Sequence, residues 1–275
     1  MRETHVILEP EPGVGVELRT WAARDALPHV VVAKGLGGCA SPDRLIDELA
    51  QHYTVHCFSP RASGLSTGHL TLDHYVGDLM LACAHVEAQT GSKPLGVGHS
   101  FGAFAFARAL GLRPVVSRVV LMAPLLNIME QTPSLVAAHL RRHVQHGRVP
   151  WSLRLLAGIY NTFIGPTSDG VPGGGAGIAQ QRFAPGSMLP FLRSVLDSAP
   201  CTQPLTAPAL VMLAGKGNTG LRIGNLAQLA AQWRALNAEA RSYAHLDHFM
   251  SRGGGFFDSP ETGALMADIR AHLGV

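Results

Sequence analysis

The stretch Gly98-His99-Ser100-Phe101-Gly102 has the pattern G-x-S-x-G and decides the fold. Residues 94–97 before it (P-L-G-V) are short and apolar like a buried strand, and residues 103–110 after it (A-F-A-F-A-R-A-L) are rich in helix formers. A strand that turns sharply into a helix exposes the central serine, while the flanking glycines let neighbouring backbones approach closely. The sequence therefore predicts that Ser100 is a nucleophile on a strand–helix turn.

Apolar runs of strand length recur along the chain with helix-like segments between them. They cover residues 29–33, 53–58, 94–97, 115–122 and 209–214. Amphipathic segments separate them, such as residues 72–87 and residues 42–51, for which Ser41 is the expected N-cap. This alternation predicts an α/β fold, a mostly parallel sheet with helices on both faces. Residues 6–8 and 15–21 favour an antiparallel opening of the sheet.

The alternation breaks after residue 124 and resumes at residue 204. Residues 125–203 contain helix-like patches, such as residues 135–146, but no clear buried strand. Because a structureless loop of this length is uncommon, we expect a mainly helical cap insertion. Residues 1–124 and 204–275 then form the two parts of one core.

The composition excludes several classes of protein. Of the 275 residues, 47% are hydrophobic and 15% are charged, which favours a large buried core and argues against disorder. The formal net charge of +3 is too small to indicate nucleic-acid binding. The densest basic cluster, formed by Arg141, Arg142 and Arg148, is interpreted as a solvated helix face.

No motif indicates a metal or an organic cofactor, and we expect neither. The chain has no HExxH, no phosphate-binding GxxxxGK and no dinucleotide fingerprint, and its four cysteines lack CxxC spacing. No apolar run reaches the roughly 20 residues that span a bilayer, and the N-terminus does not resemble a signal peptide. We expect a reduced, cytoplasmic protein without a membrane span.

With these landmarks in order, the chain resembles the α/β-hydrolase superfamily, in the capped form common among bacterial esterases and lipases. The resemblance rests on the turn around Ser100, on the loop Gly35-Leu36-Gly37 after an early strand, and on His248 after the last strand. Residues 61–66 (R-A-S-G-L-S) also look like the R-G-x-G-x-S turn of that superfamily. The resemblance implies the α/β-hydrolase fold for the whole chain except the cap.

A serine hydroxyl needs a neighbouring base to remove its proton during attack. Among the 14 histidines, His248 is the best candidate because it follows the last predicted strand, and His245 is the alternative. His99 is interpreted as a usual residue of the serine turn. The resemblance implies that the backbone N–H groups of Phe101 and Leu36 stabilise the oxyanion.

The chain departs from the superfamily pattern at two positions. Lys34 stands where a histidine usually precedes the loop glycine. It is interpreted either as a partly exposed loop lysine or as a substrate contact that attracts an anionic group. The other departure is Asn218, in the stretch Gly215-Lys216-Gly217-Asn218, where the family usually has the triad Asp of G-x-x-D.

Asparagine can orient the imidazole but supplies no charge. Of the nearby carboxylates, Glu130 could replace the missing acid by reaching back from beyond the preceding strand. Asp247 should point away from its neighbour His248 and is not expected to replace it. Ser100 and His248 with Asn218 as a neutral orienter is the leading constellation.

These residues favour a serine-dependent hydrolase or acyl-transfer enzyme that acts on an ester or thioester of a lipophilic small molecule. The apolar acyl or ring-containing substrate is inferred from the larger cap residues, Trp151, Leu155, Leu156, Tyr160, Phe163 and Phe191. One alternative is a lyase, cyclase or cofactor-free oxygenase that uses His248 as its base. Another is a ligand-binding relative with little turnover.

Overall fold

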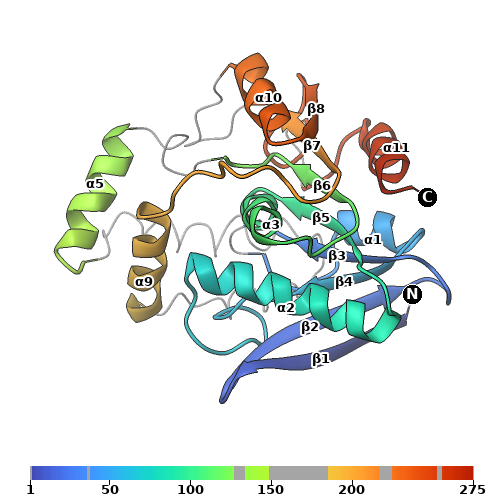
Figure 1. The fold of residues 1–275 in the computed structure, drawn as a ribbon, viewed down its shortest axis with the longest axis horizontal. Coiled ribbons are helices and arrows are strands. Elements are labelled where there is room, and N and C mark those ends of the chain that lie inside the picture. Colours follow the sequence, from blue (N-terminus) through green and yellow to red (C-terminus); the bar gives the residue numbers. More distant parts are fainter. Residues whose placement is uncertain are drawn as a thin grey trace.

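The structure, a computed structural model, describes residues 2–35, 38–126, 134–148, 185–216, 225–252 and 256–274. Its described strands form one eight-stranded sheet with the order β1-β2-β4-β3-β5-β6-β7-β8 (Figure 1). The strands are β1 (Arg2–Glu11), β2 (Val14–Ala22), β3 (His29–Ala33), β4 (Thr54–Phe58), β5 (Leu95–His99), β6 (Val119–Met122), β7 (Ala209–Ala214) and β8 (Ala238–Tyr243).

The sheet is antiparallel at its opening and parallel from β4 to β8. β1 pairs with β2 in antiparallel register, as the sequence predicted, and β2 also pairs with β4 in antiparallel register. In the parallel part, Val97 of β5 pairs with Val32 on one side and Val120 on the other. These central strands are continuous apolar runs because helices cover both of their faces.

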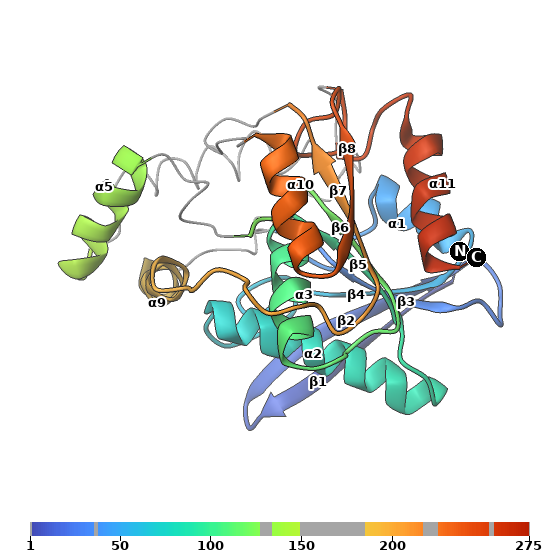
Figure 2. The ribbon, with the colours of Figure 1, turned by 45° about the horizontal axis from the view of Figure 1, so that its top comes forward.

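Helices lie on both faces of the sheet, which confirms the predicted fold class (Figure 2). The helices are α1 (Arg44–Ala50), α2 (Leu72–Thr90), α3 (Phe101–Leu112), α5 (Ser134–Gln145), α9 (Pro185–Leu196), α10 (Leu226–Ala235) and α11 (Thr262–Leu273). α2, α3 and α10 share one hydrophobic core, and α1 and α11 share the other. Within the described ranges, no helix combines the length and the apolar character that crossing a membrane requires.

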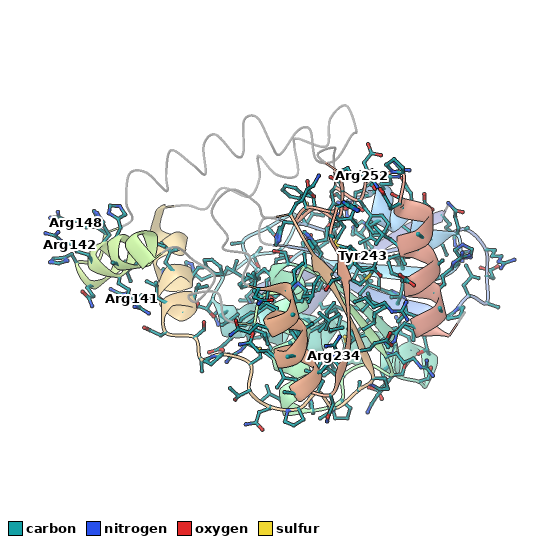
Figure 3. All side chains as sticks on the ribbon, turned by 90° about the horizontal axis from the view of Figure 1, so that it is seen from above. Arg141, Arg142, Arg148, Arg234, Tyr243 and Arg252 are labelled. Carbon is teal, nitrogen blue, oxygen red and sulfur yellow. The ribbon has the colours of Figure 1, made fainter. Side chains whose placement is uncertain are left out.

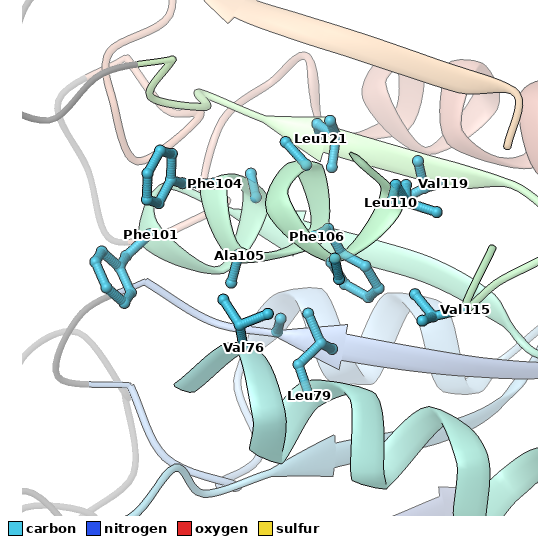
Figure 4. Close-up of a cluster of buried hydrophobic side chains, with 14 of the residues drawn as sticks. Val76, Leu79, Phe101, Phe104, Ala105, Phe106, Leu110, Val115, Val119 and Leu121 are labelled. Atoms are coloured by element: carbon cyan, nitrogen blue, oxygen red, sulfur yellow. The ribbon is translucent and has the colours of Figure 1, made fainter. Parts of the chain in front are cut away.

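Helix α3 is packed into the first of these cores along nearly its whole surface. Phe104, Phe106 and Leu110 are fully buried, and Figure 4 shows them with Val76 and Leu79 of α2 nearby. A helix enclosed on all sides has an apolar sequence all round, which explains why residues 101–110 carry only one charged side chain. The serine turn is therefore mounted on a rigid element.

The helices α5 and α9 lie between β6 and β7 in sequence, within the segment predicted as a helical cap. Ser194 of α9 contacts the core, because its Oγ accepts a 2.8 Å hydrogen bond from the backbone N–H of Leu72. The basic side chains Arg141, Arg142 and Arg148 are exposed, as expected for a solvated face (Figure 3). Residues 127–133 and 149–184 lie outside the described residues, and with them most of the predicted cap, including its large residues between Trp151 and Phe163.

The predicted start of the first helix is wrong by two residues. α1 begins at Arg44, and its N-cap is Asp43, whose Oδ1 accepts a 3.0 Å hydrogen bond from the N–H of Ile46. The predicted cap, Ser41, instead accepts from Lys34 at its carbonyl oxygen. Lys34 thus contacts both the predicted cap, Ser41, and the observed cap, Asp43.

Candidate active site

Ser100 occupies the turn between β5 and α3, as the sequence predicted. Its φ of 54° and ψ of −114° lie in a region that non-glycine residues rarely adopt, which is a strained conformation. The N–H of Ser100 donates to Met122 O at 2.9 Å, and its carbonyl accepts the first helical bond of α3, from Phe104 N at 3.0 Å. Hydrogen bonds to the neighbouring strand β6 and to helix α3 thus stabilise the strained backbone of Ser100.

The glycines of the pattern are required by close backbone approaches. A Cβ at Gly102 would lie 2.0 Å from the carbonyl oxygen of Ala33, at the end of β3. A Cβ at Gly98 would lie 2.7 Å from Cα of Ala103. Neither contact can be relieved by a side-chain rotation, because the opposing atoms belong to the backbone.

His248 is the histidine that the structure brings to Ser100. Its Nε2 lies 2.7 Å from Ser100 Oγ, within hydrogen-bond distance, whereas His245 is exposed to solvent. Burial lowers the pKa of His248 to about 4, and the nearby charge of Asp247 partly offsets this effect. The imidazole is therefore neutral at neutral pH and can accept the serine proton.

Asp247 shapes the turn that carries His248. Its Oδ1 accepts hydrogen bonds from the backbone N–H groups of Phe249 at 2.9 Å and Ser251 at 3.1 Å. The same turn is tied to the end of β7, because Lys216 N donates to Leu246 O at 2.8 Å. The carboxylate of Asp247 thus accepts hydrogen bonds from the backbone of its own turn and stabilises it.

His99 makes a contact that the sequence did not predict. Its Nε2 lies 2.7 Å from the backbone carbonyl oxygen of His248, so the serine turn touches the histidine turn directly. Burial, followed by the charge of His248, lowers the pKa of His99 to about 3. The only sequence signal for this contact is a histidine directly before the nucleophile.

Lys34 is buried, which differs from the expected partly exposed loop lysine. Its side chain is 8% exposed, and Nζ lies 2.7 Å from Oδ2 of Asp43 and 2.6 Å from the carbonyl oxygen of Ser41. Burial is the largest single effect and lowers the pKa of Lys34, but the charge of Asp43, the hydrogen bond to Asp43 and the nearby thiols of Cys57 and Cys39 together outweigh it, so the pKa is raised. The ammonium that was predicted to attract an anionic substrate group thus faces Asp43, a partner that the sequence analysis missed.

The loop after β3 approaches the nucleophile closely. A Cβ at Gly35 would lie 3.4 Å from Cβ of Ser100. Tyr75 Oη donates to the carbonyl oxygen of Lys34 at 2.6 Å, and Gly38 N donates to Gly35 O at 2.9 Å.

Phe101, one predicted oxyanion donor, is the first residue of α3, where N–H groups have no partner within the helix. The other predicted donor, Leu36, lies outside the described residues.

Asn218 and Glu130, two of the residues considered for the position of the triad acid, also lie outside the described residues. The segment that leads to Asn218 is described as far as Lys216. In it, Gly215 N donates a 3.0 Å hydrogen bond to Tyr243 O, beside the histidine turn. Searched over the described ranges alone, the structure contains no group of three or more His, Cys, Asp or Glu side chains that could hold a metal ion.

Ser100 lies on a strained strand–helix turn of a mostly parallel sheet, and its hydroxyl contacts a histidine from beyond the last strand. This arrangement defines the α/β-hydrolase class of site. Residues 30–262 match the model described as the alpha/beta hydrolase family. The chain belongs to this family, in agreement with the resemblance in its sequence. No curated protein sequence matches it.

Solved structures share the fold over nearly the whole chain. A hydrolase from Pseudomonas aeruginosa PA01 has 16% identity and a TM-score of 0.67, with 98% of each chain covered. The esterase RhEst1 from Rhodococcus sp. ECU1013 has 17% identity and a TM-score of 0.63, with 98% of this chain and 97% of that chain covered. An enol-lactonase from Burkholderia xenovorans LB400 has 16% identity and a TM-score of 0.61, with 96% and 98% covered.

Proposed function

We propose that this chain is a serine hydrolase that cleaves an ester or thioester of a lipophilic small molecule. The observation that carries the proposal is the 2.7 Å contact between Ser100 Oγ and His248 Nε2, on a serine held at a φ of 54°. A base at this distance can take the serine proton as the hydroxyl attacks a carbonyl carbon.

The reaction then proceeds in two steps, acylation and deacylation of Ser100. Ser100 Oγ attacks the carbonyl while His248 Nε2 takes its proton, and the protonated His248 returns that proton to the leaving alcohol or thiol. Water attacks the acyl-serine in the same way and releases the acid. The N–H groups of Phe101 and Leu36 stabilise the oxyanion of both tetrahedral intermediates.

The cost of charging His248 determines what the residue behind it must do. A pKa lowered from 6.5 to about 4 means that the imidazolium costs about 3 kcal/mol more than in water. In our proposal Asn218 orients the ring but does not offset this cost, because an amide carries no charge. Turnover is therefore slower than an Asp at this position would give.

This role predicts a gain of function. Asn218→Asp should raise kcat by about 10- to 100-fold, because a carboxylate stabilises the imidazolium and raises the pKa of the base. The pH profile of kcat/KM measures both effects, and its acid limb should move to higher pH. Asn218→Ala is the control and should lower kcat. An unchanged pH profile in Asn218→Asp would contradict the proposal that Asn218 orients the His248 ring.

The lipophilic substrate is supported by the aromatic surroundings of the serine. Phe101, the residue after the nucleophile, contacts Phe191 of α9 with ring centroids 5.7 Å apart and Tyr75 of α2 at 4.9 Å. The segment between β6 and β7 thereby reaches the serine turn with an aromatic side chain. We propose that this segment caps the site and lines it with apolar groups.

A fluorophosphonate probe tests the nucleophile. The native chain should be labelled and should hydrolyse p-nitrophenyl butyrate, whereas Ser100→Ala should lose both properties while its urea midpoint stays close to that of the native chain. Mass spectrometry of the labelled peptide should place the adduct on Ser100. Equal labelling of Ser100→Ala, or none of the native chain, would overturn the proposal.

A further inference from the structure

We propose that His99 is a positioning residue, which fixes the turn carrying the base against the turn carrying the nucleophile. The inference deepens the proposed function and rests on it. His99 precedes the nucleophile directly in the chain, while His248 is 149 positions further on. The His99 side chain thus links the turn of the nucleophile to the turn of the base.

The polarity of the contact fixes the tautomer of His99. A backbone carbonyl oxygen only accepts, so the Nε2 that lies 2.7 Å from His248 O must carry the hydrogen. His99 is 7% exposed, so water is largely excluded as a competing donor. Loss of the N–H would leave the His248 carbonyl without this bond in a largely buried place.

Packing holds the His99 ring in one orientation. Phe256 covers it with ring centroids 4.7 Å apart, and the His248 ring lies 5.2 Å away. On another side, a Cβ at Gly35 would lie 3.2 Å from Nδ1, so the loop after β3 lies directly against the ring. His99 therefore sits where three catalytic segments meet: the serine turn, the histidine turn and the loop beside the nucleophile.

The same surroundings keep His99 neutral. Its pKa is lowered to about 3 by burial first, then by the charges of His248 and Lys34. A neutral ring keeps a single tautomer over the working pH range, so the bond to His248 O is always present. A neutral ring also adds no repulsion to the imidazolium that forms on His248 during attack.

The effect on rate follows from the precision that proton transfer requires. A displacement of about 1 Å between a base and its nucleophile costs on the order of 100-fold in rate. A positioning role lowers kcat and the rate of labelling, but it leaves KM nearly unchanged because the His99 ring is buried against Phe256 and the His248 carbonyl.

The test compares two substitutions of similar shape. His99→Gln keeps an N–H donor at about the reach of Nε2, whereas His99→Met has the same length and no donor. We expect His99→Met to lower kcat and the fluorophosphonate labelling rate by about 10- to 100-fold with KM within about threefold. His99→Gln should recover most of the loss. Equal rates in the two variants would overturn the positioning role.

Two further measurements keep the outcome decisive. If the native chain itself is not labelled, the proposed function and this inference both fail, whereas native labelling with a wild-type rate in His99→Met overturns only the role of His99. Should His99→Met not fold, ¹H–¹⁵N NMR of the native chain reads the tautomer directly. A neutral Nε2–H tautomer down to pH 5 is expected, and an Nδ1–H tautomer would overturn the inference.

Discussion

At the scale of single residues, the buried pair of Lys34 and Asp43 is the most consequential charge interaction beside the site. Removal of one partner leaves the other charge buried without compensation, which costs about 3–5 kcal/mol. We therefore predict that Lys34→Met lowers the free energy of unfolding by about this amount, measured by urea denaturation. The side chains of Lys34 and Asp43 are 8% and 5% exposed, so water cannot replace the lost partner.

Two variants separate the pair from the loss of a lysine as such. Lys93 is exposed, so Lys93→Met should change stability by less than about 0.5 kcal/mol. In Lys34→Met/Asp43→Asn both charges are absent, while the Asn side-chain oxygen can still cap α1. The double variant should therefore recover about half of the loss or more. Strict additivity of the two single substitutions would show that the pair is not coupled.

The residues of the site differ in how well they can be predicted from the sequence. Ser100 is marked by a local pattern and His248 by its place after the last strand, so both could be named, and the structure brings them together. Asp43 and His99 could not be assigned roles, because their partners are set by the packing of loops that are distant in sequence or irregular. Burial of Lys34 was missed for the same reason.

At the scale of elements, the approach of α3 to β3 depends on one glycine. A Cβ at Gly102 would lie 2.0 Å from Ala33 O and 2.6 Å from Lys34 O, so Gly102→Ala must push the serine turn away from the loop after β3. We predict a loss of about 3 kcal/mol in the free energy of unfolding and a slower rate of fluorophosphonate labelling. Urea denaturation and the labelling rate check the two parts.

The matched control is Gly77→Ala, in the interior of α2. Its Cβ would have no atom within 4 Å, and Gly77 has an ordinary helical φ. Because Ala is a better helix former than Gly, this variant should gain about 1 kcal/mol and be labelled at the native rate. A similar loss in both variants would mean that the close approach to β3 is not the cause.

The helices and strands themselves were largely predictable, because strand and helix impose different periods on buried side chains. The start of α1 was not, because Asp43 and Ser41 are both residue types that suit an N-cap, and only the structure shows that Asp43 accepts the capping hydrogen bond. The segment between β6 and β7 was predicted as helical, and α5 and α9 agree with that in its described part.

At the scale of the whole molecule, the apolar runs indicate which segments form the sheet, but they do not indicate its buried histidines. His56 lies among the core strands, with Nδ1 2.9 Å from Thr20 Oγ1 and Nε2 2.9 Å from His29 Nδ1. Burial, followed by the charges of His29 and His85, lowers its pKa to about 3. With His99 at about 3 and His248 at about 4, the native state keeps several rings neutral that an unfolded chain would protonate.

These depressed pKa values predict how stability depends on pH. Well above pH 6.5 the rings are neutral in both states and contribute no slope. Below it the unfolded chain binds protons that the native state refuses, so stability falls as pH drops from 6.5 towards 4, by up to about 1.4 kcal/mol per pH unit for each histidine. Urea midpoints between pH 7.5 and 5.5 measure this slope. His56→Gln should reduce it by about one proton relative to the native chain. A slope in His56→Gln equal to that of the native chain would contradict a neutral buried His56.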